Sequence, residues 1–256
     1  METFRAKFRF DPAKSLMIGV ERECFLVDLA GDIVPAAPQL LEVLTDRDRF
    51  GYELSACQLE ERVGPSTLHG LRELLVRNDE EMSAAEKLVG VQRLHIDVAP
   101  ETMPLDVYPD PTGRYREITR SMPREVLCAA CRIVGTHVHV GMPDHATALA
   151  VYNAVIGKTK EFSRIGDRSG SGERLRIYRT VAPDCDPRPY QNWEDFYVEA
   201  HKRGCVEDPR RIWTLIRISV HGTLEFRMFG VSPDFDIILE WVQLCHDACR
   251  EAMAGL

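Results

Sequence analysis

The amino-acid sequence predicts an α+β fold in which an antiparallel β-sheet forms a cleft or half-barrel and helices pack on its back. The expected strands alternate apolar and polar residues, which is typical of a sheet with one face on a core and the other face open. The expected helices are interspersed with these strands, and no internal repeat or clear domain linker divides the chain. With 256 residues, 45% of them hydrophobic, the chain can bury a core as one large domain or as two closely fused ones.

The first half of the chain alternates between strand and helix patterns. Residues 16–27 predict a strand with Glu21 and Glu23 on one face and apolar residues on the other, where only Arg22 breaks the pattern. The sequence then predicts a short helix over residues 38–44 and a strand over 54–63 that ends at Gly64 and Pro65. A helix over 66–89 follows and ends at Gly90, and a strand is expected over 91–98. After a proline-rich connection we expect a helix over 114–131 with a break or restart at Pro123.

The second half contains a strand with two histidines. His137 and His139 lie between Gly135 and Gly141, and residues two apart share one face of a strand. The other expected elements are a helix over residues 144–156 with Asp144 as its N-cap, a short helix capped by Asn192, two strands or one bent strand over 212–229, and a final helix over 232–253.

Composition argues against several classes of partner. The formal net charge of −8 disfavours binding to nucleic acid or to an anionic membrane, because both favour a basic surface. The N-terminus lacks the apolar core of a signal peptide, and no apolar run approaches membrane-spanning length, so we expect a cytoplasmic protein. The eight cysteines lie mostly inside apolar stretches and are expected to be reduced core residues, with a metal or redox role as the less favoured alternative.

Carboxylates and imidazoles recur on the polar faces of the expected strands. Glu21, Glu23, Glu60 and Glu225 offer oxygen ligands of the kind that Mg²⁺ uses beside nucleotide phosphates. A histidine such as His137 among them would also suit Mn²⁺ or Zn²⁺. Each motif alone has a structural explanation, because Glu-x-Glu is most often a solvated strand face. The recurrence over several strands is what indicates a metal-binding cleft.

Arginines near these strands extend the prediction. Arg227 shares a face with Glu225, where it could neutralise charge during phosphoryl transfer or clamp a substrate carboxylate. Arg174 follows the glycine- and serine-rich stretch 169–172, which lacks the lysine spacing of a P-loop. A flexible surface loop is therefore the default interpretation of that stretch.

Taken in order, these segments resemble the type 2 glutamate–cysteine ligase family, carboxylate–amine ligases related to glutamine synthetase. The most specific match is Gly135-Thr136-His137-Val138-His139-Val140-Gly141. The other matching segments, which together cover nearly the whole chain, are Gly19-Val20-Glu21-Arg22-Glu23, residues 58–65, the proline-rich stretch ending in Arg114-Tyr115, Arg174-Leu175, residues 192–196, Trp213 and residues 222–227.

The resemblance implies a glutamine synthetase-like sheet whose cleft holds ATP, Mg²⁺ (or Mn²⁺) and an amino-acid carboxylate. ATP would phosphorylate the γ-carboxylate of glutamate or a similar acid, and an amine would displace the phosphate to give an amide. Carried over residue by residue, the metal ligands would be Glu21, Glu23, Glu60, His137 and Glu225; the catalytic arginines would be Arg227 and Arg174; and the nucleotide-binding residues would be His139, Arg227 and Arg62.

Departures from the family pattern leave other functions open. No serine-rich segment is recognisable over residues 157–166, Arg217 follows Trp213 by four residues where the family has three, and Gly230 stands where an acidic residue is common. Family members are also generally longer, so residues 1–256 are expected to form a single ligase-like domain that could lack a C-terminal part. Exposed sheet edges in such folds often pair, which makes a homo-oligomer an option.

Two other classes of function fit the same residues. One is a metal-dependent hydrolase that uses the histidines and glutamates to activate water, which predicts tightly held zinc and activity without ATP. The other is a non-catalytic relative that binds a nucleotide or an amino acid, which predicts ATP binding without turnover. The sequence does not name the amine, because no motif indicates a thiol pocket.

Overall fold

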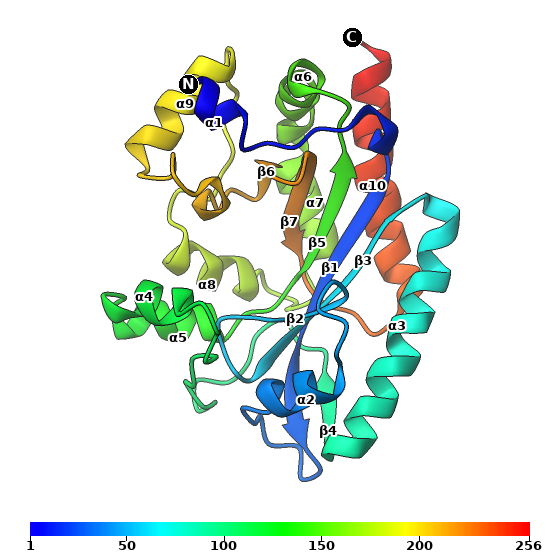
Figure 1. Cartoon of the computed structure of the whole chain (residues 1–256), viewed down its shortest axis with the longest axis vertical. Coiled ribbons are helices and arrows are strands. Elements are labelled where there is room, and N and C mark those ends of the chain that lie inside the picture. The colour runs from blue at the N-terminus through cyan, green and yellow to red at the C-terminus, as the bar shows by residue number, and fades with distance from the viewer.

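A seven-stranded antiparallel sheet forms the centre of the computed structural model, which describes residues 1–256 (Figure 1). The strand order is β2-β3-β1-β5-β7-β6, and β4 pairs with the far end of β1. The strands are β1 (Ile18–Asp28), β2 (Phe50–Tyr52), β3 (Gln58–Ser66), β4 (Val91–Leu94), β5 (Thr136–Gly141), β6 (Ile216–Ser219) and β7 (Thr223–Phe229). The sheet is open, with β2 and β6 at its edges, which confirms the predicted antiparallel α+β architecture.

Four helices cover the back of the sheet. They are α3 (Leu68–Val89), α6 (His145–Val155), α7 (Thr159–Gly166) and α10 (Phe235–Ala254), and they contact β3, β5, β6 and β7 (Figure 1). On the opposite side of the sheet α5 packs against α8, with α4 next to them (Figure 1). The bounds of these three helices are α4 (Arg114–Arg120), α5 (Arg124–Cys131) and α8 (Glu173–Val181). The other helices are α1 (Glu2–Arg5), α2 (Ala37–Val43) and α9 (Trp193–Lys202). Short 3₁₀ turns lie at Pro12–Lys14, Ile156–Lys158 and Pro209–Arg211.

The main hydrophobic core lies between the back of the sheet and these helices. Val20, Val138 and Phe226 come from three neighbouring strands and are at most 1% exposed. Phe229 stacks on Trp241 of α10, with ring centroids 5.3 Å apart. Burial of this apolar face leaves the other face of β1, β5 and β7 for polar side chains.

Capping residues that the sequence indicated occupy their expected places. Asp144 caps α6, with Oδ1 accepting the backbone N–H of Thr147 at 2.8 Å. Asn192 caps α9 in the same way. Gly90 ends α3 in the left-handed conformation at φ 79°, where a side chain would be unfavourable.

Three expectations about the elements were wrong. The strand expected over residues 54–63 begins only at Gln58, because residues 55–58 form a turn closed by Gln58 N–H donating to Ser55 O at 3.1 Å. That strand also continues past Pro65, since Ile18 of β1 pairs with Ser66. The strand expected over 91–98 stops at Leu94, where its pairing with β1 ends. Helices α7 and α8 had not been expected.

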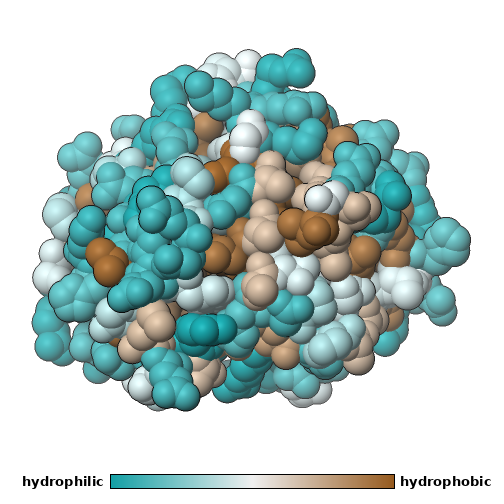
Figure 2. All heavy atoms as spheres, turned by 90° about the horizontal axis from the view of Figure 1, so that it is seen from above, coloured by the Kyte–Doolittle hydropathy of each residue, from teal (hydrophilic) through white to brown (hydrophobic).

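Hydrophilic residues cover most of the end of the molecule that carries both termini, with hydrophobic ones gathered near its middle (Figure 2). Large exposed hydrophobic side chains, such as Leu29 and Leu88, are far apart in the sequence. No helix combines the length and the apolar composition that crossing a bilayer requires.

Candidate active site

Strand register gathers the polar residues on the front of the sheet. Glu21 of β1 lies directly across from His137 of β5, and His139 lies across from Glu225 of β7. On the other side of β1, Glu23 is paired with Glu60 of β3. Because side chains opposite one another on one face are close, the register alone brings together six residues that lie up to 204 positions apart in the sequence.

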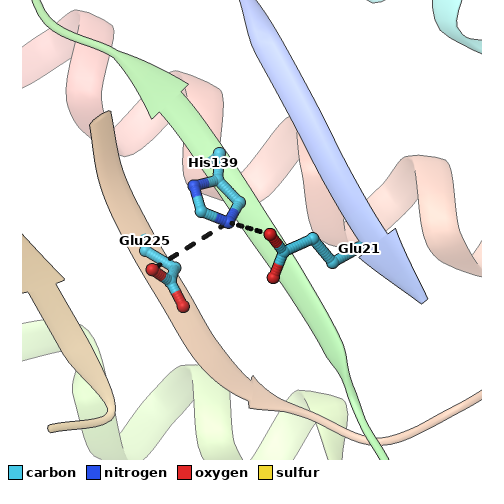
Figure 3. Close-up of side chains that lie close together, drawn as sticks. All are labelled: Glu21, His139 and Glu225. Carbon is cyan, nitrogen blue, oxygen red and sulfur yellow. Dashed lines mark ion pairs between the residues drawn. The ribbon is translucent and has the colours of Figure 1, made fainter. Parts of the chain in front are cut away.

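The first cluster of potential metal ligands consists of Glu21, His139 and Glu225. Their ligand atoms all lie within 4.8 Å of one another, and the imidazole stands between the two carboxylates (Figure 3). His139 Nε2 is 3.5 Å from Glu21 Oε1 and 4.0 Å from Glu225 Oε2. Each residue comes from a different strand, so the cluster depends on the assembled sheet.

The chemistry of this cluster suits a divalent cation. His139 is 7% exposed, and its Nε2 is buried without a hydrogen-bond partner, although two carboxylates face it. Burial disfavours the charged ring, but Glu21 and Glu225 outweigh it and raise the pKa of His139. A cation held by the same three residues would take the place of the ring proton, and an imidazole with two carboxylates suits Mn²⁺ or Zn²⁺ as well as Mg²⁺.

A second cluster, of carboxylates only, lies beside the first. It consists of Glu23, Glu53 and Glu60, whose ligand oxygens are likewise within 4.8 Å of one another. Burial and the neighbouring Glu60 raise the pKa of Glu23 to about 7. Burial together with Glu60 and Glu23 raises the pKa of Glu53 well above its usual range. Three crowded carboxylates without a cation are electrostatically unfavourable, which is the environment that a hard cation such as Mg²⁺ relieves.

Sequence reasoning missed Glu53, because it lies in the connection between β2 and β3 and belongs to no alternating pattern. Its only sequence signal is its closeness to the strand that carries Glu60. The pairing of Gly51 with Glu60 in the β2–β3 hairpin is what brings the Glu53 carboxylate back over that strand.

His137 lies between the two clusters and belongs to neither. Its Nδ1 is 3.0 Å from Glu21 Oε2, and its Nε2 is 3.7 Å from Glu23 Oε1. Burial, with the nearby Arg227, lowers the pKa of His137 to about 4. His139, and not His137, therefore belongs to a cluster of potential metal ligands, while His137 lies between a carboxylate of each cluster.

Two arginines surround Glu225. Arg217 of β6 forms two bonds to this carboxylate, Nε to Oε2 at 2.7 Å and Nη2 to Oε1 at 2.9 Å, and Arg227 Nη1 also bonds Oε1. Burial opposes ionisation of Glu225, but Arg217 and Arg227 keep its pKa below the usual range. Glu225 is fully buried and stays a carboxylate, and Arg227 lies directly beside it.

Arg174 and Arg62 lie at the margins of the cleft. Arg174 is 4% exposed, and its Nε donates to the backbone carbonyl of Val134 at 2.6 Å, so it connects α8 to the start of β5. Arg62 bonds Glu60 through Nε and the backbone carbonyl of Arg47 through Nη1 at 3.1 Å. Arg62 is thus close to the second cluster, while the guanidinium of Arg174 is largely occupied by backbone oxygens.

Two cavities open onto these clusters. One, of about 270 Å³, is lined by the acidic residues and by an apolar and aromatic wall that includes Leu54, Ile118, Ile133, Val181 and Trp213. The other, of about 620 Å³, is lined by basic residues including Arg9, Lys14 and Arg62. Glu21, Glu60 and His221 border both, so the clusters are reached from two directions.

Comparison with known proteins finds relatives over most of the chain. A protein of Mycolicibacterium vanbaalenii named "Putative glutamate--cysteine ligase 2-2" is 34% identical over 86% of this chain and 64% of its own length. Proteins named "Putative glutamate--cysteine ligase 2-3" in Rhodococcus jostii and "Putative glutamate--cysteine ligase 2" in Thermobifida fusca are each 27% identical, over 96% and 88% of this chain. Over most of its length the chain is similar to proteins named as type 2 glutamate–cysteine ligases. No family model matches it.

The chain spans only part of these family members. It covers 32% of the Rhodococcus protein, 61% of the Thermobifida protein and 64% of the Mycolicibacterium protein. A solved structure, that of a bifunctional glutathione synthetase from Pasteurella multocida, aligns with a TM-score of 0.58 over 93% of this chain and 41% of that chain, at 13% identity. That likeness concerns the fold alone.

Two departures from the glutamate–cysteine ligase pattern have structural explanations. Arg217, displaced by one residue relative to Trp213, still reaches Glu225, because β6 pairs it directly across from that residue. At Gly230 a β-carbon would lie 2.3 Å from Asp97 Oδ2, so the carboxylate of Asp97 fills the space where the family often has an acidic side chain.

Proposed function

We propose that the protein is an ATP-dependent carboxylate–amine ligase that forms a γ-glutamyl or similar amide through an acyl phosphate. A carboxylate oxygen of the acid attacks the γ-phosphorus of ATP, and ADP leaves. The amine nitrogen then attacks the acyl carbon, inorganic phosphate leaves, and the nitrogen loses a proton. We further propose that residues 1–256 act as one domain with a glutamine synthetase-like sheet.

The observation that carries this proposal is the pair of ligand clusters in one cleft. Glu21, His139 and Glu225 on one side and Glu23, Glu53 and Glu60 on the other could each hold a divalent cation. Bound there, Mg²⁺ or Mn²⁺ would neutralise the phosphate oxygens of ATP. Phosphoryl transfer needs chiefly positioning and charge neutralisation, which this arrangement of carboxylates and arginines supplies.

The residues of the chain divide the remaining tasks. Arg227 lines the 270 Å³ cavity beside Glu225, where its guanidinium can contact a transferred phosphoryl group. Arg217 bonds both oxygens of the same carboxylate and thereby fixes its orientation. The apolar wall of the 270 Å³ cavity would limit the access of water to an acyl phosphate bound there.

The names of the relatives support the same reaction class. Proteins named glutamate–cysteine ligase would join a glutamate carboxylate to an amine, and their similarity to this chain extends over 96% and 88% of it. Glutamate or a similar acid is therefore our proposed first substrate. The amine is left open, because none of the residues that line the 270 Å³ cavity is a cysteine or another group specific for a thiol.

The test is ADP release by the purified chain with Mg²⁺, ATP and glutamate, with a panel of amines that includes cysteine. We expect ADP formation that requires both the acid and one of the amines, and its loss in Glu225→Gln. ATP binding with no turnover for any amine would favour a non-catalytic relative. Hydrolytic activity without ATP, together with zinc retained through purification, would favour a metal-dependent hydrolase.

A further inference from the structure

Thr223 is a neighbour of the first ligand cluster, and the proposed function assigns it no role. It lies on β7 two residues before Glu225, so both side chains are on the same face of the strand. Its Oγ1 is 2.8 Å from Nδ1 of His139. Thr223 is paired with Gly141 and not with His139, so the contact is a diagonal one across the two strands.

The contact involves the ring nitrogen opposite the ligand atom. His139 Nε2 faces Glu21 and Glu225, so it can bind a cation only if the proton of the neutral ring is on Nδ1. A hydroxyl oxygen at 2.8 Å is a suitable acceptor for that N–H. Metal-binding histidines commonly have such an oxygen partner, which fixes both the tautomer and the ring plane.

We propose that Thr223 is the positioning residue of His139: its hydroxyl accepts the Nδ1–H and so directs the Nε2 lone pair into the space between Glu21 and Glu225. The inference rests on the proposed metal centre, but it concerns affinity and ring geometry and not the reaction. The Thr223 hydroxyl forms no hydrogen bond with the clustered carboxylates. Its effect on metal binding is exerted through the imidazole.

The experiment compares Thr223→Val, which keeps the shape of the side chain and removes the hydroxyl, with Thr223→Ser, which keeps the hydroxyl. Thr136→Val is the matched control, because Thr136 is a buried strand residue of β5 whose hydroxyl has no partner. Mn²⁺ binding is titrated calorimetrically without ATP or substrates. We expect Thr223→Val to weaken one site by roughly 10- to 100-fold, and Thr223→Ser and Thr136→Val to bind nearly as the wild type.

A second measurement reads the ring directly. Nitrogen chemical shifts of the His139 ring in the Mg²⁺-loaded wild type should report the proton on Nδ1, and the fixed tautomer should be lost in Thr223→Val. Wild-type affinity in a folded Thr223→Val protein, with an unchanged tautomer, overturns the inference. If Thr223→Val does not fold, Thr223→Ala is titrated instead and judged in the same way. If the wild type binds no Mn²⁺, the metal centre itself is wrong, and the proposed function fails together with this inference.

Discussion

Two glutamates in the same cleft ionise differently because of their neighbours. Glu225 is fully buried, yet Arg217 and Arg227 keep it charged. Glu53 has carboxylates as its closest charged neighbours, and burial together with Glu60 and Glu23 raises its pKa. The second cluster is therefore costly to the folded protein until a cation is bound, which is common at sites where function takes precedence over stability.

Glu53→Gln should stabilise the metal-free protein while weakening its metal binding. The amide is nearly isosteric with the carboxylate and removes one of three crowded charges, so we expect a gain on the order of 1 kcal/mol in the free energy of unfolding. Thermal unfolding in EDTA measures this gain. With Mg²⁺ in place of EDTA, the melting temperature of Glu53→Gln should rise less than that of the wild type.

Glu80→Gln is the control for that substitution. Glu80 is exposed on α3 at the back of the sheet, and its side chain forms no ion pair or hydrogen bond, so its replacement should change neither stability nor the response to Mg²⁺. A melting temperature for Glu53→Gln in EDTA below that of the wild type would contradict the account of the second cluster as a site of charge repulsion.

At the scale of elements, strands β1 and β3 are joined on their back face by a buried ion pair. Arg22 is paired with Glu61 in the strand register, Nη1 is 3.3 Å from Oε2, and both side chains are at most 6% exposed. Phe235 of α10 lies 5.1 Å from the guanidinium carbon. This pair explains why Arg22 interrupts the apolar pattern of β1.

Removing one partner should cost far more than removing both. Arg22→Met or Glu61→Leu alone leaves a charge buried without its counter-ion, and we expect a loss of about 3–5 kcal/mol in the free energy of unfolding. The double substitution fills the space with apolar groups and should recover most of that loss. Urea unfolding of the four proteins gives the interaction energy, and additive losses would show that the two residues are not coupled.

At the scale of the whole molecule, the two clusters tie together strands that are distant in the chain. Their ligands come from β1, β3, β5, β7 and the β2–β3 connection, so the complete set exists only in the folded sheet. A cation that binds the folded state and not the unfolded chain stabilises the protein through mass action.

Mg²⁺ or Mn²⁺ should therefore raise the unfolding temperature of the entire chain. At a free concentration 100 times the dissociation constant the stabilisation is about 2.7 kcal/mol, which corresponds to roughly 5 to 10 °C for a chain of this size. Differential scanning calorimetry with and without EDTA measures the shift. It should disappear in Glu21→Gln combined with Glu60→Gln, and a shift that persists in this variant would place the binding site elsewhere.

The sequence by itself determined most elements and indicated the family. Alternating patterns located β1, β5 and β7, and the caps Asp144 and Asn192 marked the starts of two helices, because strand periodicity and capping depend on neighbouring residues only. The residue types and their order around Glu21, His137 and Glu225 indicated metal chemistry and the glutamate–cysteine ligase family, because such motifs can also be read from short stretches of sequence.

Only the tertiary structure decided which residues meet. Strand register placed His139, not His137, between Glu21 and Glu225, although the sequence gives both histidines the same face. The connection between β2 and β3 added Glu53, which no periodicity marks. Register and loop paths follow from the packing of the whole sheet against its helices, so residues far apart in the sequence determine them, and local patterns do not encode them.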